Sequence, residues 1–415
     1  MNLVVIDFKE LYQEESNAQV ERYSKIKEGF SNQFGDAEGI EFFSAPGRTE
    51  IGGNHTDHNY GRVLAGAVNL DIVAAARRTD DHKISLKSYE YPNMDLVDLE
   101  NLSLDSKEIG KASALIKGIC VKCKELGFQV GGFEAYTMSR VLKGSGLSSS
   151  AAFEIVIVAI INELYNDGKI DPITAAVIAQ YAENVYFGKP SGLLDQMASS
   201  VGGVTFMDFK DIKIPVVEHI DFDLHSYGYA LCVVDTGGNH ADLTDEYAYI
   251  PAEMKSVASF FGKEVLREVN PKDFWEQIGE IRKKTGDRAV LRAMHFFEED
   301  VLAAEEANAI KAGDFHSFKT LVKKSGESSE TRLQNVFAVV NPAEQGLSLA
   351  LALSKKILGD KGVCRVHGGG FAGTIQAFVP FEMLNEYKAE VERVFGSGSC
   401  YVLSIRLVGG TKVNL

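Results

Sequence analysis

A glycine- and serine-rich loop ahead of an apolar segment is the part of the sequence best suited to holding a phosphate. Its residues are Lys143, Gly144, Ser145, Gly146, Leu147, Ser148, Ser149 and Ser150. Glycines let the backbone approach a phosphate without a Cβ clash, and a helix start presents unpaired N–H donors. Serine hydroxyls add hydrogen bonds or coordinate Mg²⁺. A plain serine N-cap is the alternative, and the loop by itself leaves both interpretations open.

A second polar stretch, residues 45–61, concentrates groups that bind hydroxyls, phosphates or metals. Its polar side chains are Arg48, Glu50, Asn54, His55, Asp57, His58 and Asn59. Two interpretations of these side chains compete. Imidazole and carboxylate groups close together could bind a metal ion. The same groups in a pocket could instead bind sugar hydroxyls, with the arginine facing a phosphate. A hydrogen-bonded surface loop is the third interpretation. No later His/Asp cluster completes a metal site, so the sequence disfavours the metal.

Two acidic residues, Glu183 and Asp195, frame a third motif. Asp195 follows the turn Gly188-Lys189-Pro190-Ser191-Gly192 and opens a predicted helix. The alternative interpretation is that Asp195 only stabilises the N-terminus of this helix and has no catalytic role. A glycine turn at residues 367–373 lies between two strand-like segments, where a plain hairpin is the simpler interpretation.

The elements that must position these groups are a mixture of strands and helices. Apolar or alternating segments predict strands at residues 67–77, 132–139, 204–207, 213–220 and 227–235. Long apolar segments predict helices at residues 148–164 and 172–186, and helices dominate from 253 to about 355. A helix at 383–395 and a strand at 401–407 close the chain. This mixture predicts an α+β fold with domains at residues 1–220 and 221–415.

Length, charge and cysteine content bound the function. The 415 residues are enough for two domains, and the net charge of -15 argues against general binding to nucleic acid or anionic membranes. Five scattered cysteines fit a reducing compartment. No stretch approaches the apolar length that spans a bilayer, and the N-terminus has no basic region typical of a signal peptide. We therefore expect a cytoplasmic protein.

Three of these motifs together resemble a known enzyme superfamily. Residues 143–152 (KGSGLSSSAA) resemble the second signature of the GHMP small-molecule kinases, and residues 367–373 (HGGGFAG) resemble the third. Residues 47–61 are similar to the galactokinase signature Gly-Arg-x-Asn-Leu-Ile-Gly-Glu-His-Thr-Asp-Tyr-Asn-x-Gly. The chain is identified as a divergent galactokinase-like member. The resemblance implies a two-domain GHMP kinase fold: an N-terminal ribosomal-S5-like α/β lobe with a left-handed βαβ nucleotide loop, and a C-terminal ferredoxin-like α+β lobe.

The resemblance also implies roles for individual residues. Arg48 and Asp195 would be catalytic, Asp195 as the base. The sugar would be bound by Asn54, His55, Asp57, Gly192 and Tyr247. ATP would lie on Gly144, Ser145, Gly146, Leu147, Ser148, Ser149 and Ser150, with Mg²⁺ on Ser150 and Glu183. Glu50 and Asn54 depart from the signature, which has asparagine and a sugar-binding glutamate at these two places.

The implied reaction is ATP-dependent phosphorylation of D-galactose at its anomeric hydroxyl, by a monomer or weak homodimer. Asn54 motivates the alternative of a kinase for N-acetylgalactosamine, L-arabinose or galacturonate. A catalytically silent galactose sensor is a further alternative of another class. It is disfavoured because the serine loop is complete and Asp195 is present.

Overall fold

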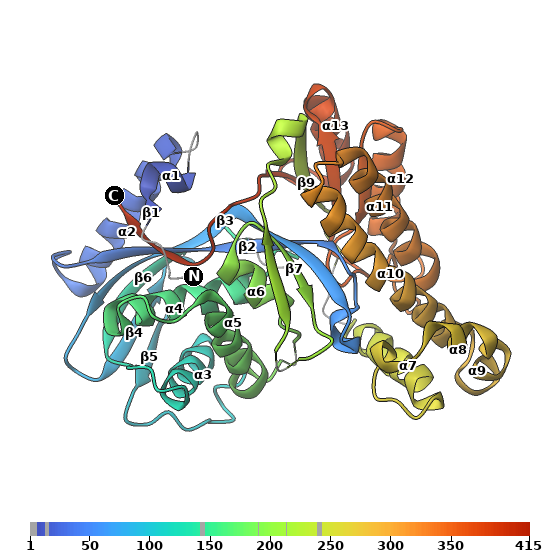
Figure 1. Ribbon diagram of the computed structural model, residues 1–415. Helices are drawn as coiled ribbons and strands as arrows, with labels where there is room; N and C mark the ends of the chain where they lie inside the picture. The colour runs from blue at the N-terminus through green and yellow to red at the C-terminus, as the bar shows by residue number, and fades with distance from the viewer. Residues whose placement is uncertain (1–5, 13–15, 142–145, 190, 213, 239–242) are drawn as a thin grey trace.

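The computed structural model describes residues 6–12, 16–141, 146–189, 191–212, 214–238 and 243–415, which form two lobes, each built on its own sheet (Figure 1). The first sheet has nine strands: β1 (Ile6–Asp7), β2 (Glu41–Gly52), β3 (Arg62–Arg78), β4 (Lys83–Ser88), β5 (Met94–Asp98), β6 (Phe133–Ser139), β7 (Val204–Asp208), β8 (Val216–Ile220) and β13 (Thr411–Asn414). Its helices are α1 (Phe8–Tyr12), α2 (Ser16–Phe34), α3 (Ala112–Glu125), α4 (Ser149–Asn166), α5 (Pro172–Tyr181) and α6 (Leu194–Val201).

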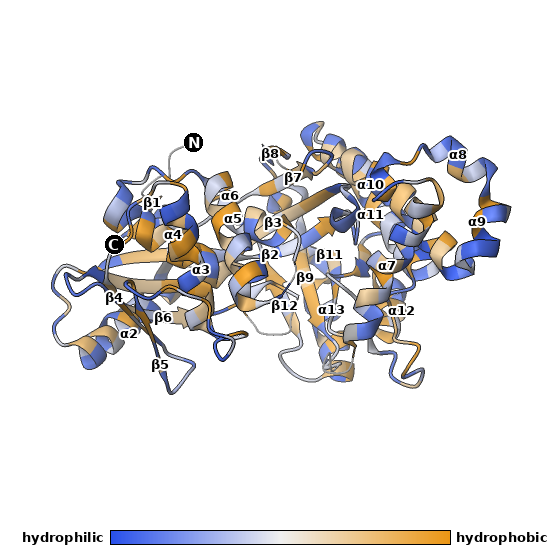
Figure 2. Ribbon diagram, turned by 90° about the horizontal axis from the view of Figure 1, so that it is seen from below, coloured by the Kyte–Doolittle hydropathy of each residue, from blue (hydrophilic) through white to orange (hydrophobic). Residues whose placement is uncertain are grey.

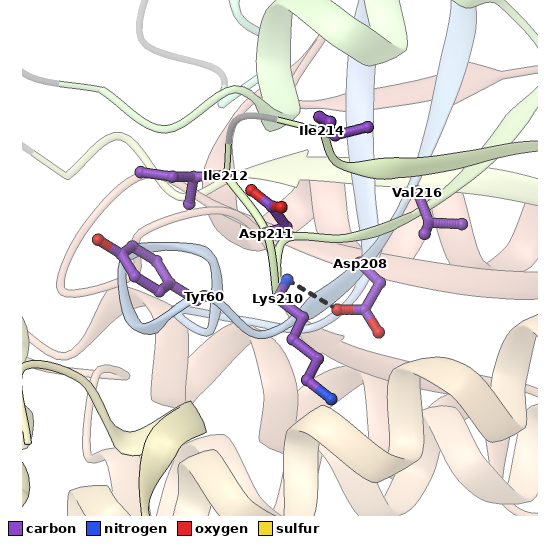
Figure 3. Close-up of a pocket in the computed structure, with 7 residues that line it drawn as sticks. All are labelled: Tyr60, Asp208, Lys210, Asp211, Ile212, Ile214 and Val216. Atoms are coloured by element: carbon purple, nitrogen blue, oxygen red, sulfur yellow. Dashed lines mark hydrogen bonds between the residues drawn. The ribbon is translucent and has the colours of Figure 1, made fainter.

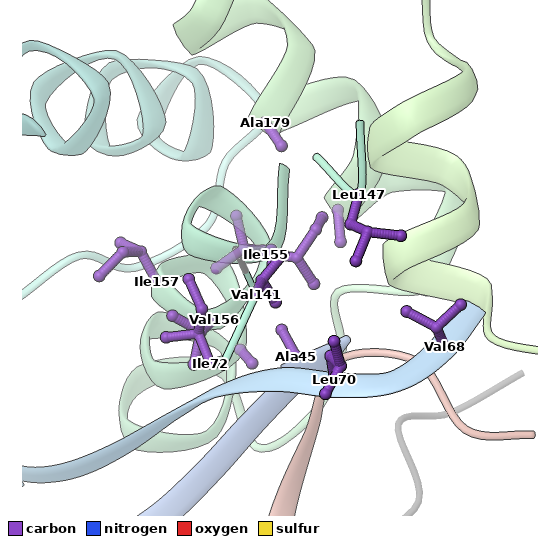
Figure 4. Close-up of a cluster of buried hydrophobic side chains, with 14 of the residues drawn as sticks. Ala45, Val68, Leu70, Ile72, Val141, Leu147, Ile155, Val156, Ile157 and Ala179 are labelled. Carbon is purple, nitrogen blue, oxygen red and sulfur yellow. The ribbon is translucent and has the colours of Figure 1, made fainter. Parts of the chain in front are cut away.

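Strand β3 organises the first lobe because it is apolar along nearly its whole length. It pairs antiparallel with β2, β6 and β7, so most of its side chains are buried. Helix α4 is also apolar on most of its surface, which is typical of a helix packed in a core. Figure 4 shows Ile155, Val156 and Ile157 of α4 over the β2 and β3 side chains. These elements confirm the predicted strand at 67–77 and helix at 148–164.

The second lobe has a four-stranded antiparallel sheet in the order β12-β9-β11-β10. Its strands are β9 (Tyr229–Asp235), β10 (Val363–Val366), β11 (Thr374–Pro380) and β12 (Cys400–Leu403), and its helices are α7 (Thr244–Phe260), α8 (Pro271–Glu276), α9 (Ile278–Thr285), α10 (Asp287–Lys311), α11 (Phe315–Ser328), α12 (Gly346–Leu358) and α13 (Phe381–Phe395). The chain order β-α-β-β-α-β with this strand order is the ferredoxin-like arrangement. The extra helices α8 and α9 form a hydrophilic extension at the far end of this lobe (Figure 2).

The last strand belongs to the first lobe although it lies within the predicted second domain, 221–415. Strand β13 lies in the first sheet, between β1 and β2, so the chain returns to the first lobe at its end. A buried ionic cluster fixes this return: Asp71 of β3 accepts hydrogen bonds from Arg22 and from Arg406, the latter at 3.1 Å. Although burial opposes the charge, the two arginines lower the pKa of Asp71 to about 2.

Two predicted elements have different bounds in the structure. The helix predicted at 172–186 ends as α5 at Tyr181, and residues Ala182–Phe187 continue as a π-helical turn. The strand predicted at 213–220 begins only at Val216. A π-helical turn is often found at a functional site, and this one carries Glu183. Within the described part of the chain, the helices are too short or too polar for any of them to span a bilayer.

Candidate active site

Arg48 and Asp195 form the centre of the site. Register shifts in the β2–β3 pairing occur on both sides of Arg48, between Pro46 and Arg48 and between Glu50 and Gly52. Such bulges re-aim side chains, and here Arg48 reaches helix α6, where its Nε donates to Asp195 Oδ1 at 2.6 Å. Arg48 also donates to the carbonyl of Gly146. One arginine thus joins β2, the serine loop and α6.

Asp195 is held on both carboxylate oxygens. The Ser148 hydroxyl donates to Oδ2 at 2.7 Å, while Arg48 occupies Oδ1. Burial by itself would raise the pKa of Asp195, but the Arg48 charge and these hydrogen bonds lower it below its usual value. The carboxylate is therefore ionised at neutral pH, and its side chain remains 24% exposed.

The serine loop is not a simple helix cap. Ser148 precedes α4 with a left-handed φ of 54°, and within the described residues its hydroxyl bonds Asp195 rather than a backbone N–H of the first turn. The Ser148 hydroxyl therefore takes none of the first-turn N–H donors of α4, which begin at Ser149. Leu147 is fully buried among core side chains, which anchors the loop (Figure 4), and its carbonyl accepts from Arg48 N at 2.9 Å. The predicted ATP contacts Gly144 and Ser145 lie outside the described residues.

The glycine turn at 367–373 packs directly on this loop. A Cβ at Gly146 would lie 2.9 Å from His367 Nδ1, so only glycine fits there. His367 is buried between Thr49, at 3.1 Å from its Nε2, and Thr374, at 2.9 Å from its Nδ1. Burial, together with the nearby arginines, lowers the pKa of His367 to about 3, so the ring is neutral. The turn thus supports the serine loop.

Ser150 and Glu183, predicted to hold a metal, are in contact. Ser150 Oγ donates to Glu183 Oε1 at 3.0 Å, and Lys189 Nζ donates to the same oxygen at 2.8 Å. Ser191 Oγ and Gln196 Nε2 donate to Glu183 Oε2 at 2.6 and 2.7 Å. A carboxylate and a hydroxyl beside a phosphate loop are the hard oxygen ligands that Mg²⁺ prefers, so these residues fit that ion.

The predicted sugar set divides between two places: Asp57 and Gly192 lie near Asp195, whereas His55 and Tyr247 contact the glycine turn at 367–373. A Cβ at Gly192 would collide with the Asp57 carboxylate, so the turn before α6 lies directly on the signature loop. Burial, together with the charge of Asp195, raises the pKa of Asp57 to about 6. His55 Nε2 lies 2.9 Å from the Gly369 carbonyl, and the Tyr247 hydroxyl donates to the Gly370 carbonyl at 2.8 Å.

Asn54 contradicts its predicted role as a sugar ligand. It is fully buried, and its amide nitrogen donates to Glu50 Oε1 and to the Gly368 carbonyl, both at 2.8 Å. Its oxygen accepts from Asn335 Nδ2 at 2.9 Å and from the Ser329 hydroxyl at 3.4 Å. A side-chain amide has two donor and two acceptor positions, and protein groups occupy all four. Asn54 therefore ties the signature loop to the second lobe.

The sequence prediction missed the buried charges behind the signature loop. Glu299 of α10 accepts from the backbone N–H groups of Gly53 and Asn54, at 2.9 and 3.1 Å. Arg365 of β10 is fully buried and lies 3.3 Å from Glu50 Oε1. Glu306 of α10 points at Gly52, where any Cβ would collide with it. The glycine in place of the signature's isoleucine thus makes room for a glutamate 254 positions later in the chain, and no local pattern could have indicated this pairing.

The metal interpretation of His55, Asp57 and His58 finds no support. The two imidazoles lie near each other, with ring centroids 5.6 Å apart, but within the described ranges no three or more His, Cys, Asp or Glu side chains gather into a group that could hold a metal ion. A surface pocket beside the signature loop is lined by Tyr60, Asp208, Lys210, Asp211, Ile212, Ile214 and Val216 (Figure 3). None of the residues around Arg48 and Asp195 lines it, so it is separate from the site.

Comparisons with known proteins agree with this geometry. Residues 28–78 match the family model described as the galactokinase galactose-binding signature, and residues 114–203 match the GHMP kinase N-terminal domain. The chain is 31% identical to the galactokinase of Streptomyces coelicolor over 90% of its length and 92% of the relative's. It is also 31% identical to that of Actinobacillus pleuropneumoniae, over 85% of its length and 88% of the relative's.

Solved structures show the same fold. The crystal structure of Lactococcus lactis galactokinase complexed with galactose superimposes with a TM-score of 0.80 at 25% identity, covering 94% of this chain and 99% of that chain. A mevalonate kinase structure, at 15% identity and a TM-score of 0.62, covers 88% of this chain and 98% of its own and shares the fold. The two-lobed α+β architecture is therefore that of the GHMP kinases, and the chain is a sugar kinase that belongs to the galactokinase family.

Proposed function

We propose that the protein transfers the γ-phosphoryl group of ATP to the anomeric hydroxyl of D-galactose. The observation that carries this proposal is the convergence of the Arg48–Asp195 pair, the α4 N-terminus and Asp57 in one site. An ionised carboxylate beside a phosphate-binding helix start can orient and deprotonate an alcohol, and an arginine can neutralise charge on the transferred group. The family and the galactose-complexed relative supply the sugar.

The proposed mechanism assigns a role to each polar residue of the site. Asp195 accepts the hydroxyl proton at Oδ2, the oxygen now bonded to Ser148, while Arg48 holds Oδ1 and keeps the carboxylate in place. Backbone N–H groups at the start of α4 and the Ser148–Ser150 hydroxyls bind the triphosphate. Ser150 and Glu183 would hold Mg²⁺, which supplies charge neutralisation between the phosphates when bound. Asp57, His55 and Gly192 line the sugar side, with Tyr247 beside the Gly369–Gly370 turn.

The decisive experiment is an ADP-release assay with Mg²⁺-ATP against galactose, N-acetylgalactosamine, L-arabinose and galacturonate. Turnover with galactose at the highest kcat/KM supports the proposal. Turnover of another of these sugars without turnover of galactose would assign the protein to the alternative that Asn54 motivates. Binding of ATP and galactose without ADP release would instead identify a sensor.

We also propose that the enzyme is cytoplasmic and that it is a monomer or weak homodimer. The boundary between its two lobes is proposed to lie near residue 220. All five cysteines are buried and free, which supports a reducing compartment.

Acidic pH is expected to weaken use of the sugar because Asp57 has a raised pKa. A protonated carboxyl gains one donor but loses acceptor capacity for sugar hydroxyls. Since the pKa of Asp57 is about 6 in the free protein, kcat/KM for the sugar should fall as the pH drops through about 6. Asp57→Asn should lower kcat/KM at all pH values and remove this step from the profile. A step that persists in the variant would assign it to another group.

A further inference from the structure

Lys189 combines an exposed side chain with a buried partner. It lies between the π-helical turn of Glu183 and helix α6, and its side chain is 55% exposed. Its ammonium nevertheless donates at 2.8 Å to Glu183, whose side chain is only 1% exposed. A long flexible stem that reaches from solvent to a buried carboxylate can also leave it without unfolding its surroundings.

The contact falls on one particular oxygen of Glu183. Oε2 is held by Ser191 and Gln196, whereas Oε1 accepts from Ser150 and Lys189 together. Glu183 Oε1, which also accepts from the Ser150 hydroxyl, is the oxygen that the predicted Ser150–Glu183 pair would offer to a metal ion. An ammonium and a divalent cation cannot both contact it closely, because like charges repel.

The charges around Lys189 are those of the reaction centre. Burial opposes its charge, but Glu183, followed by Asp195 and Glu154, raises the pKa of Lys189 above its usual value. The ammonium is thus charged at neutral pH and lies close to both the metal-binding candidate and the candidate base. Displaced from Glu183, it can turn to the triphosphate at the start of α4, which carries more negative charge than either remaining carboxylate.

We propose that Lys189 is a triphosphate-binding residue that neutralises Glu183 in the nucleotide-free protein and transfers to the phosphates when a divalent ion takes that carboxylate. The inference rests on the ATP site of the proposed function and does not depend on which sugar is used. It assigns to Lys189 both the counter-charge that keeps a buried carboxylate stable before metal binding and a direct contact to ATP afterwards. The Lys189 ammonium therefore has two positions, and its contact to Glu183 is the one that it occupies before the metal and ATP bind.

Binding of ATP measured by calorimetry, without turnover, tests the phosphate contact. With Mg²⁺ present and no sugar added, Lys189→Met should weaken ATP binding by about 10-fold or more, because a charge-assisted hydrogen bond to the phosphates is lost. Lys189→Arg should keep most of the affinity because it keeps the charge. Lys169→Met is the matched control, because Lys169 is an exposed, ion-paired lysine beyond the far end of α4. Equal binding of Mg²⁺-ATP by wild type and Lys189→Met would overturn the proposal.

Binding of Mn²⁺ to the nucleotide-free protein, followed by electron paramagnetic resonance, tests the other position. Removing a competing ammonium should strengthen Mn²⁺ binding several-fold in Lys189→Met, whereas loss of a merely structural support would weaken it. Unchanged or weaker Mn²⁺ binding would contradict the exchange. Both readouts are independent of catalysis: a wild type that binds ATP but phosphorylates none of the four sugars would refute the proposed function and leave this test intact.

Discussion

Asp195→Asn should lower kcat by about 10³-fold, within the range that general base catalysis contributes. The asparagine keeps the shape of the side chain: its oxygen can accept from Arg48 while its Nδ2 donates to the Ser148 hydroxyl oxygen, so the site should remain assembled. It cannot take the proton of the attacking hydroxyl. Calorimetric ATP affinity should therefore stay within about 3-fold of wild type while the chemical step is lost.

Asp208→Asn is the matched control for that experiment. Asp208 also pairs with arginines, Arg62 at 3.0 Å and Arg267 at 2.9 Å, and its side chain is 17% exposed. It lies on β7, at the separate surface pocket, and should be dispensable for catalysis. Near-normal turnover in Asp195→Asn, or an equal loss in both variants, would refute the assignment of Asp195 as the base.

Asn54→Glu should destabilise the protein by about 3 kcal/mol, although it restores the residue of the galactokinase signature. The new carboxylate would be fully buried, facing Glu50 and the Gly368 carbonyl, which accept from the present amide. Burial already raises the pKa of Glu50 to about 7, and a second buried carboxylate beside it would raise the pKa further, so ionising both groups at pH 8 costs free energy. Urea unfolding at that pH measures the loss.

A double variant distinguishes repulsion from a general packing defect. Glu50→Gln leaves a side chain of the same size that can donate to a carboxylate at position 54. Glu50→Gln/Asn54→Glu should therefore recover at least about 1 kcal/mol relative to Asn54→Glu alone. A double variant less stable than either single variant would show that Glu50 and Asn54 do not interact as the structure indicates.

Short-range features of the chain were predictable because they depend on neighbouring residues. The apolar run of α4 and the strand β3 follow from local periodicity, and the serine loop follows from residue types that suit a phosphate. Asp195 could be singled out because a turn and a helix start place it at an element boundary. Its pairing with Arg48 spans 147 positions, and the sequence indicated it only through resemblance.

Other features could be decided only by the folded chain. The role of Asn54 depends on Asn335 and Gly368, which are 281 and 314 positions away, and a hydrogen bond between such residues leaves no periodic signal in either segment. The same holds for Gly52 with Glu306 and for the return of β13 to the first sheet.

Residue types and short spacings therefore determined which chemistry the chain can perform. The tertiary structure alone decided which polar groups lie in the active site and which form hydrogen bonds that join the lobes. The reason is that a buried donor or acceptor must pair with the nearest partner in space, however distant that partner is in sequence.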